Sequence, residues 1–171
     1  PIFIAGSTHE GEEAVIIDVF KRLLADHPRL RLVLAPRYIE RAAKLKALAE
    51  AAGLSVRART DKDPAAEPPR VVVLDTIGEL SLAYGLGSLV FVGGSFTSRG
   101  GQNILEPAAQ GRPVLFGPNM DNFHDSVQVL VGRGGIQVKD ADHLHRVAHE
   151  LLSRPEKLAE LGELARTAVT Q

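Results

Sequence analysis

The sequence contains no cysteine among its 171 residues. It can therefore form neither a disulfide framework nor a thiolate metal site, which fits a reducing compartment. No stretch approaches the roughly 18 apolar residues that a membrane span requires, and no signal peptide is visible. The 20 Lys and Arg residues nearly balance the 21 Asp and Glu residues, so the overall charge favours neither nucleic acid nor an anionic membrane. No interleaving of aromatic and basic residues points to nucleic acid either.

Apolar residues make up 44% of the chain, which is enough to build a hydrophobic core. The length suits one domain, and we expect residues 1–171 to form it. The chain opens directly on the apolar run Ile2–Ala5, without an initiator methionine. This opening suggests a domain excised from a longer protein, and we expect catalytic residues to lie in the missing part.

Strand-like and helix-like segments alternate along the whole chain. The expected strands are Ile2–Ala5, Leu30–Leu34, Ser55–Arg59, Val71–Leu74, Ser88–Val92, Pro113–Phe116 and a small further one at Gly135–Val138. The expected helices are Glu12–Asp26, Tyr38–Ala52, Gly78–Leu86, Asn103–Gln110, Asn122–Val131, Ala141–Leu152 and Pro155–Val169. Thr60–Pro69, rich in Asp and Pro, is expected to be a loop. Because the strands lack polar alternation and are separated by helices, they predict an α/β fold, a Rossmann-like, doubly wound parallel sheet of about six strands.

Polar clusters directly follow four of the expected strands. They are Gly6–Glu10, Pro36–Arg37, Asp75–Glu79 and Gly93–Ser95. In parallel α/β sheets, ligands bind outside the carboxyl ends of the strands. We therefore expect the four clusters to lie along one rim of the sheet and to form a binding site there.

The glycine-rich stretch Phe91–Ala109 is the most informative part of the chain. Glycines let a backbone approach a ligand closely, and the free amides of a helix start favour an anion. Glu106 lies one turn into the helix expected to begin near Asn103, where its carboxylate could accept hydrogen bonds from two vicinal sugar hydroxyls. The pattern predicts a nucleotide, with phosphate on the amides and ribose on Glu106. The alternative is a tight turn in which Asn103 only caps the helix and Glu106 only interacts with the helix dipole.

The other candidates at the rim also have two interpretations each. Arg37 could bind a phosphate or a sugar carboxylate, or it could be a solvated surface arginine. Ser7 and Thr8 are expected to open a helix, either as ligand contacts or as a simple cap. His9 beside Glu10 invites a hydrolase interpretation, but no nucleophile elbow surrounds Ser7.

Two further patterns favour neither a GTPase nor a metal site. Asp75–Gly78 is similar to the magnesium-binding turn of GTPases, but the chain has no phosphate loop ending in Gly-Lys-Ser/Thr. His145 and His149 share a helix face, with His143 nearby. Without thiolates or a matching carboxylate arrangement we expect these histidines to form a solvated face, and we expect no metal.

Taken together, these clusters resemble the bacterial Kdo transferases, which attach 3-deoxy-D-manno-octulosonic acid (Kdo) to lipid A precursors. The resemblance runs nearly end to end. It rests on the segments Ala5–Glu13, Leu34–Arg37, Asp75–Leu80, Phe91–Ser95, Gly100–Asn103, Leu105–Ala108 and Pro113–Pro118. Two positions depart from the family pattern, with Gln102 in place of a histidine and Tyr38-Ile39 in place of His-Pro.

The resemblance implies the second, donor-binding half of an inverting, metal-independent glycosyltransferase with two Rossmann-like domains (GT-B). The donor would be CMP-Kdo, a substrate, and no cofactor is expected. The family's first domain, which nothing in this chain matches, carries the general base and contacts both the lipid A precursor and the membrane. The resemblance places the full-length protein at the cytoplasmic face of the bacterial inner membrane, with this domain soluble.

The residues that this hypothesis assigns to donor binding are Ser7, Thr8, His9, Glu10, Arg37, Ile77, Gly78, Glu79, Gly94, Ser95, Gly101, Gln102, Asn103 and Glu106. Backbone amides of Gly94-Ser95 and Gly101–Asn103, together with Arg37, would neutralise the leaving phosphate. Ile77–Glu79 would bracket the cytosine. Two alternatives stay open. One is another two-domain sugar-nucleotide enzyme, such as a UDP-sugar transferase or epimerase, and the other is a non-catalytic nucleotide-binding module.

Overall fold

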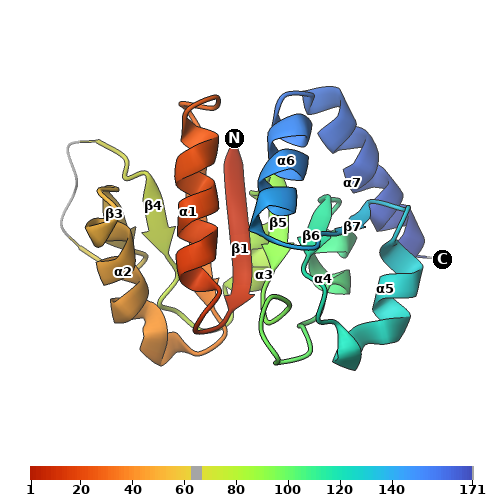
Figure 1. The fold of residues 1–171 in the computed structure, drawn as a ribbon, viewed down its shortest axis with the longest axis horizontal. Helices are drawn as coiled ribbons and strands as arrows, with labels where there is room; N and C mark the ends of the chain where they lie inside the picture. The colour runs from red at the N-terminus through yellow and green to blue at the C-terminus, as the bar shows by residue number, and fades with distance from the viewer. Residues whose placement is uncertain (63–66, 171) are drawn as a thin grey trace.

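The computed structural model describes residues 1–62 and 67–170, so residues 63–66 of the expected Thr60–Pro69 loop lie outside the described part. Its strands form one sheet of seven in the order β3-β4-β2-β1-β5-β6-β7, and every neighbouring pair is parallel (Figure 1). The strands are β1 (Ile2–Thr8), β2 (Arg31–Pro36), β3 (Val56–Ala58), β4 (Val71–Val73), β5 (Leu89–Val92), β6 (Val114–Phe116) and β7 (Gly135–Gln137). The predicted α/β class and the parallel sheet are confirmed.

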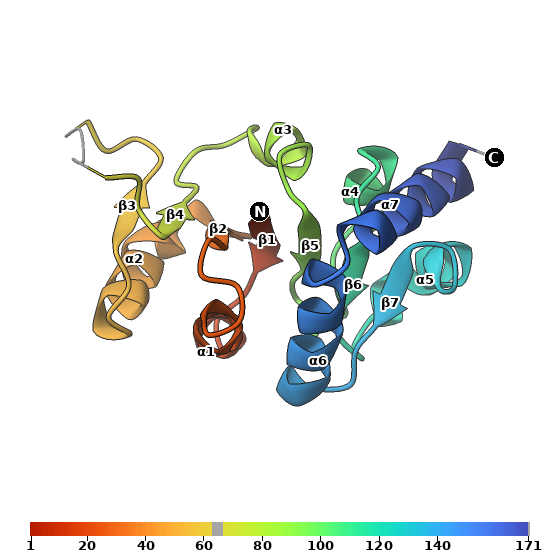
Figure 2. The ribbon, with the colours of Figure 1, turned by 90° about the horizontal axis from the view of Figure 1, so that it is seen from above.

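Helices cover both faces of the sheet (Figure 2). They are α1 (Glu13–Leu24), α2 (Ala42–Ala51), α3 (Leu80–Tyr84), α4 (Leu105–Ala109), α5 (His124–Leu130), α6 (Ala141–Leu152) and α7 (Pro155–Thr170), with short 3₁₀ turns at Ile39–Arg41 and Asp121–Phe123. Seen from above, α1, α2 and α6 lie on one face and α3, α4 and α7 on the other. The arrangement is the doubly wound one predicted from the alternating segments. Among the described helices, none is long and apolar enough to cross a bilayer.

Each face of the sheet has its own hydrophobic core, which explains why the strands read as unbroken apolar runs. In β5, Phe91 joins the cluster under α1 and α6, whereas Val90 and Val92 join the cluster under α4 and α7. All three side chains are inaccessible to solvent. A strand buried on both faces has no solvent side on which polar residues could alternate.

Chain order reverses between β1 and β5. On one side of β1 lie β2, β4 and β3, which are the next three strands along the chain. The following strand, β5, pairs with the other side of β1. In open parallel sheets this switch point is where a crevice opens at the carboxyl ends of the strands. The cavity described below lies beside this point.

Two local predictions need correction. β1 continues to Thr8 instead of ending at Ala5. The pairing with β2 is irregular at Ser7, but it resumes where Thr8 pairs with Pro36. The segment Ser7–Glu10 therefore does not open a helix, and α1 starts only at Glu13. The segment Gly135–Val138, expected as a small extra strand, pairs fully with β6 and makes the sheet one of seven strands rather than about six.

Candidate functional site

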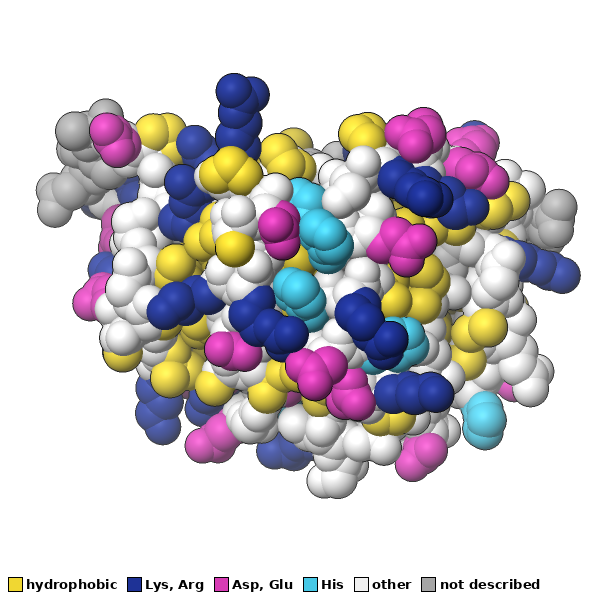
Figure 3. Space-filling model, turned by 45° about the horizontal axis from the view of Figure 1, so that its top comes forward, with side chains coloured by type: hydrophobic (Ala, Val, Ile, Leu, Met, Phe, Trp, Pro, Cys, Tyr) yellow, Lys and Arg dark blue, Asp and Glu magenta, His cyan; other side chains and the backbone are white. Residues whose placement is uncertain are grey.

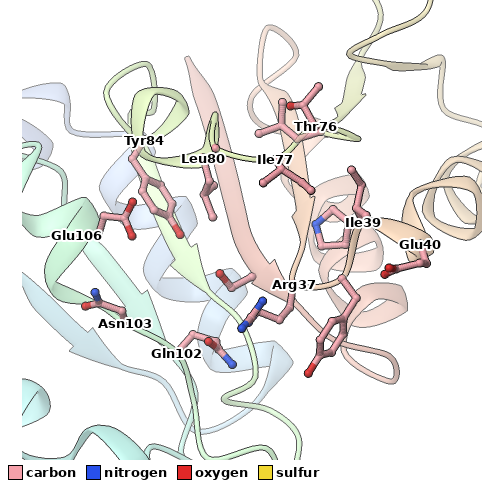
Figure 4. Close-up of a pocket in the computed structure, with 15 residues that line it drawn as sticks. Arg37, Ile39, Glu40, Thr76, Ile77, Leu80, Tyr84, Gln102, Asn103 and Glu106 are labelled. Carbon is pink, nitrogen blue, oxygen red and sulfur yellow. The ribbon is translucent and has the colours of Figure 1, made fainter.

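A cavity of about 500 Å³ opens at the carboxyl ends of β1, β2 and β4. Side chains from α3 and from the glycine-rich loop before α4 complete its wall (Figure 4). The residues that line it are Ser7, Pro36, Arg37, Tyr38, Ile39, Glu40, Leu74, Thr76, Ile77, Gly78, Leu80, Tyr84, Gln102, Asn103 and Glu106. Three of the four polar segments expected along the rim contribute to this lining, and Gly93–Ser95 does not. The structure therefore brings most of the predicted rim to one place.

Charged and polar groups face one another across this cavity. Arg37 points into it from the end of β2, towards Gln102 (Figure 4). Its guanidinium also lies over the Tyr38 ring, 5.3 Å from the ring centre, an arrangement that restricts its range of positions. Glu106 and Asn103 lie on the opposite wall, from α4 and the loop before it. A ligand in this cavity would meet a cation at one end and a carboxylate at the other.

Seven of the residues assigned from the sequence line the cavity. They are Ser7, Arg37, Ile77, Gly78, Gln102, Asn103 and Glu106. Asn103 also accepts a hydrogen bond from the amide of Leu105, the first residue of α4, through its side-chain oxygen at 2.9 Å. The N-cap of α4 is Ile104, one residue later than expected, so Asn103 does not occupy the cap position although its side chain contacts the start of the helix. Ile77 is 86% exposed and offers an apolar surface to a flat ligand.

Of the amides expected to bind phosphate from Gly94-Ser95, that of Gly94 already has a partner within the fold. The Gly94 amide donates to the Glu12 carboxylate at 2.6 Å, and the buried Ser95 side chain is bonded within the fold. The Gly101 amide donates to the Gly94 carbonyl at 3.1 Å. Within the described residues, the amides of Gln102 and Asn103 have no such partner. The Gly94 and Gly101 amides thus hold the loop in shape, and the buried Ser95 does not line the cavity, so these three residues are poor candidates for the phosphate.

Thr8 and His9 also lie outside the cavity lining, and both are buried, Thr8 as the last residue of β1 and His9 directly after it. The Thr8 hydroxyl donates to the Glu13 carboxylate at 3.1 Å. The His9 ring meets the Tyr38 ring edge-on, with 5.8 Å between centres. Burial lowers the pKa of His9, and the positive charge of Arg99 lowers it further, so the ring is neutral at pH 7. Both residues thus contact neighbours of the site, Glu13 and Tyr38, without lining the cavity themselves.

Glu10 and Glu79 do not line the cavity either. Glu10 is exposed and lies 3.8 Å from Arg41, in a groove between α1 and α2. Glu79 accepts a hydrogen bond from Thr76 at 2.5 Å and lies 3.6 Å from Arg59. The Glu79 contact closes the turn that presents Ile77 to the cavity. Both carboxylates are paired with side chains outside the cavity lining.

Sequence reasoning missed three buried residues beneath the site. Glu12 is inaccessible to solvent, and its carboxylate accepts the amides of His9 at 2.9 Å, Gly94 at 2.6 Å and Phe96 at 3.3 Å. Desolvation raises its pKa, although the three amides oppose that shift. One carboxylate thus ties the loop after β1 to the glycine-rich loop after β5.

The other two missed residues are Glu13 and Tyr84. Glu13 is 1% exposed and accepts two hydrogen bonds from the Arg41 guanidinium, at 2.9 and 2.5 Å. This charge-assisted pair raises the pKa of Arg41 and anchors the segment after β2 that carries Tyr38. Tyr84, also 1% exposed, comes from α3 and reaches the cavity wall.

Two of the histidines singled out in the sequence, His145 and His149, lie stacked on one face of α6. The part of the chain that the structure describes holds no group of three or more His, Cys, Asp or Glu side chains arranged for a metal ion. His149 is only half-exposed, because its ring nitrogen lies 2.9 Å from that of His27 beyond α1. Figure 3 shows histidines among side chains of both charge signs on this face. The expected solvated face is thus partly an α1–α6 packing contact.

Fold and site together define the class of protein. The chain has the α/β fold of GT-B glycosyltransferase domains. It superimposes on the C-terminal CMP-Kdo binding domain of WaaA from Acinetobacter baumannii with a TM-score of 0.90 and 27% identity, covering 99% of this chain and 89% of that one. Anabaena HepE in complex with UDP and glucose has the same fold, with a TM-score of 0.71 at 15% identity. No family model matches the sequence.

Curated relatives are 3-deoxy-D-manno-octulosonic acid transferases. The one from Haemophilus influenzae is 38% identical over 164 residues, which is 95% of this chain. The one from Bordetella pertussis is 35% identical over 172 residues. The resemblance to Kdo transferases expected from the motifs is confirmed. The chain spans 38% and 40% of the lengths of these two relatives.

Proposed function

We propose that this domain binds CMP-Kdo as the donor half of an inverting Kdo transferase of lipopolysaccharide biosynthesis. The observation that carries the proposal is the cavity at the switch point, with Arg37 at one end and Glu106 at the other. Its position agrees with the ligand position expected for a doubly wound sheet. The similarity to a CMP-Kdo binding domain at 27% identity supports the choice of ligand.

Each part of CMP has a complementary group in the cavity. Arg37 would pair with the phosphate, where the amides of Gln102 and Asn103 are also available. Glu106 would accept hydrogen bonds from the two ribose hydroxyls. The exposed Ile77 would pack against the flat face of the base, next to Gly78. The assignment keeps the sequence hypothesis for these residues and removes Gly94, Ser95 and Gly101.

The chemical task of this half is to stabilise the leaving group. When the bond between Kdo and CMP breaks, negative charge builds up on the phosphate oxygen, and a cation held in place lowers the energy of that state. Transfer also requires an acceptor hydroxyl and a base that removes its proton. We propose that the remainder of the full-length protein supplies both, holds the lipid A precursor and contacts the inner membrane at its cytoplasmic face. The reaction in this proposal uses neither metal nor cofactor.

Calorimetric titration of the 171-residue chain with CMP, UMP and AMP tests the ligand. CMP should bind at least about tenfold more tightly than the other two, because buried polar groups that fit one base are left unpaired by another. A UDP-sugar enzyme is the second candidate, since HepE shares the fold and holds UDP. Preference for UMP would favour that candidate. Equal binding of all three nucleotides would favour a non-catalytic module instead.

Replacing Glu106 with glutamine should weaken CMP binding by about 1–2 kcal/mol, or roughly 5- to 30-fold, because an amide is a weaker acceptor than a carboxylate and carries no charge. Binding of 2′-deoxy-CMP should change much less. Calorimetry measures both. Glu163→Gln is the matched control, since Glu163 lies on α7 outside the cavity and pairs only with Arg166. Unchanged CMP affinity in Glu106→Gln would show that Glu106 is a structural first-turn carboxylate.

A further inference from the structure

Tyr84 joins the hydrophobic core to the cavity. It lies at the end of α3 and is 1% exposed, and its ring packs in the cluster that contains Val92, Ile104 and Ala108. Tyr84 also lines the cavity, where Figure 4 shows it beside Glu106. Since α3 packs against both β1 and α4, this one side chain lies between the end of β1 and the Glu106 helix.

The backbone of β1 is shaped around the Tyr84 hydroxyl. A Cβ atom at Gly6 would lie 2.1 Å from the Tyr84 hydroxyl oxygen and 2.8 Å from the carbon that bears it. Only glycine leaves room for the phenol at this point. The next residue, Ser7, has a φ of 55°, and it is the single non-glycine residue in the described part with a positive φ. Such a conformation persists only where its surroundings hold it, and the phenol is one of those surroundings.

The phenol keeps its proton in this environment. Burial raises the pKa of Tyr84 well above its ordinary value, and the negative charge of Glu106 raises it further, while the Ser7 side chain acts in the opposite direction. A neutral phenol carries a proton that it can donate, and Ser7 and Glu106 line the same cavity. A phenylalanine would fill the core equally well, so packing alone does not require the hydroxyl.

We propose that Tyr84 is a positioning residue of the nucleotide site, whose hydroxyl holds Ser7 and Glu106 in the arrangement that recognises the ribose of the ligand. The inference rests on the proposed function and deepens it. Tyr84 itself does not need to touch the nucleotide. Its effect passes through Glu106, which contacts the sugar hydroxyls, and through Ser7, which lines the cavity at the end of β1.

The test is the Tyr84→Phe variant of the 171-residue chain, titrated with CMP and with 2′-deoxy-CMP. Affinity for CMP should fall about five- to tenfold, the effect of one lost hydrogen bond, while affinity for the deoxynucleotide stays within about twofold. Combined with Glu106→Gln, the loss should be no larger than that of Glu106→Gln alone, because both changes remove the same contact. Ser88→Ala is the control. It removes a hydroxyl that accepts a hydrogen bond from Ile2 at the start of β1, outside the cavity.

Three results would overturn the role of Tyr84. The first is wild-type CMP affinity in Tyr84→Phe, the second is an equal loss for both nucleotides, and the third is a loss that adds to that of Glu106→Gln. If the wild-type chain binds no CMP, the proposed ligand fails, and a crystal structure of unliganded Tyr84→Phe then decides the positioning role. Ser7 leaving its positive φ, or Glu106 turning away from the cavity, supports it. Unchanged Ser7 and Glu106 overturn it.

Discussion

Replacing Glu12 with alanine is expected to lower the free energy of unfolding by about 3–5 kcal/mol. The carboxylate accepts three backbone amides, those of His9, Gly94 and Phe96, and is itself inaccessible to solvent. Without it, buried donors lose their acceptor and a cavity remains. Urea denaturation followed by circular dichroism measures the change.

The geometry of the Glu12 carboxylate also predicts the order of its variants. One oxygen accepts from both His9 and Gly94, whereas the other receives only the longer contact from Phe96. Glu12→Gln keeps an oxygen for the first two amides, so we expect a smaller loss, about 1–2 kcal/mol. Asp18→Ala is the control, since Asp18 is exposed on the same helix and should change stability by less than about 0.5 kcal/mol. A Glu12→Ala variant as stable as Asp18→Ala would contradict the role assigned to Glu12.

Much of this fold could be predicted from the sequence because its strands are buried on both sides. Runs such as Leu89–Val92 carry no polar residue, and the segments between them have helical spacing, so both the class of fold and the location of the rim follow from general rules. What the pattern could not give is the end of β1. The sequence Gly6-Ser7 suggests the end of a strand, but β1 continues past Ser7 to Thr8, which pairs with Pro36 of β2.

The site was predicted where residue type decides the role and missed where partners decide it. Arg37 and Glu106 are charged residues at strand and helix ends, and the structure places both on the cavity. The Gly94 amide was misassigned because its partner, Glu12, lies 82 positions away in the sequence. One signal was present. Glu12, the residue just before α1, falls one turn before Ile16 and two before Phe20, in line with the buried face of the helix, where a carboxylate needs donors of its own.

Tyr84 illustrates the opposite case, in which an apolar environment hides a polar role. In the sequence it is one more large residue in a short helix, and its ring does pack in the core. Its hydroxyl becomes informative only when Gly6 is seen to make room for it. Close approach between residues distant along the chain leaves no periodic pattern, so sequence spacing alone could not have assigned Tyr84 to the site.

Replacing Arg37 with alanine is expected to produce the largest loss of binding, about 2–3 kcal/mol for CMP, or roughly 30- to 150-fold. Its guanidinium supplies the cation that would face the phosphate, and its position over Tyr38 limits the alternatives open to it. Cytidine, which has no phosphate, should bind the variant and the wild type equally. The CMP affinity of Arg37→Lys should lie between those of the wild type and Arg37→Ala, because an ammonium keeps the charge but cannot pair with two phosphate oxygens in one plane.

Arg31→Ala is the matched control for this experiment. Arg31 is exposed at the first residue of β2, whereas Arg37 follows the last residue of the same strand, so the two arginines lie beyond opposite ends of β2 and only Arg37 lines the cavity. Calorimetry at two salt concentrations adds a second criterion. An exposed charge pair weakens as ionic strength rises, so the difference between wild type and Arg37→Ala should shrink at high salt. If Arg37→Ala and Arg31→Ala weaken CMP equally, the effect is one of overall charge, and the phosphate must lie elsewhere in the cavity.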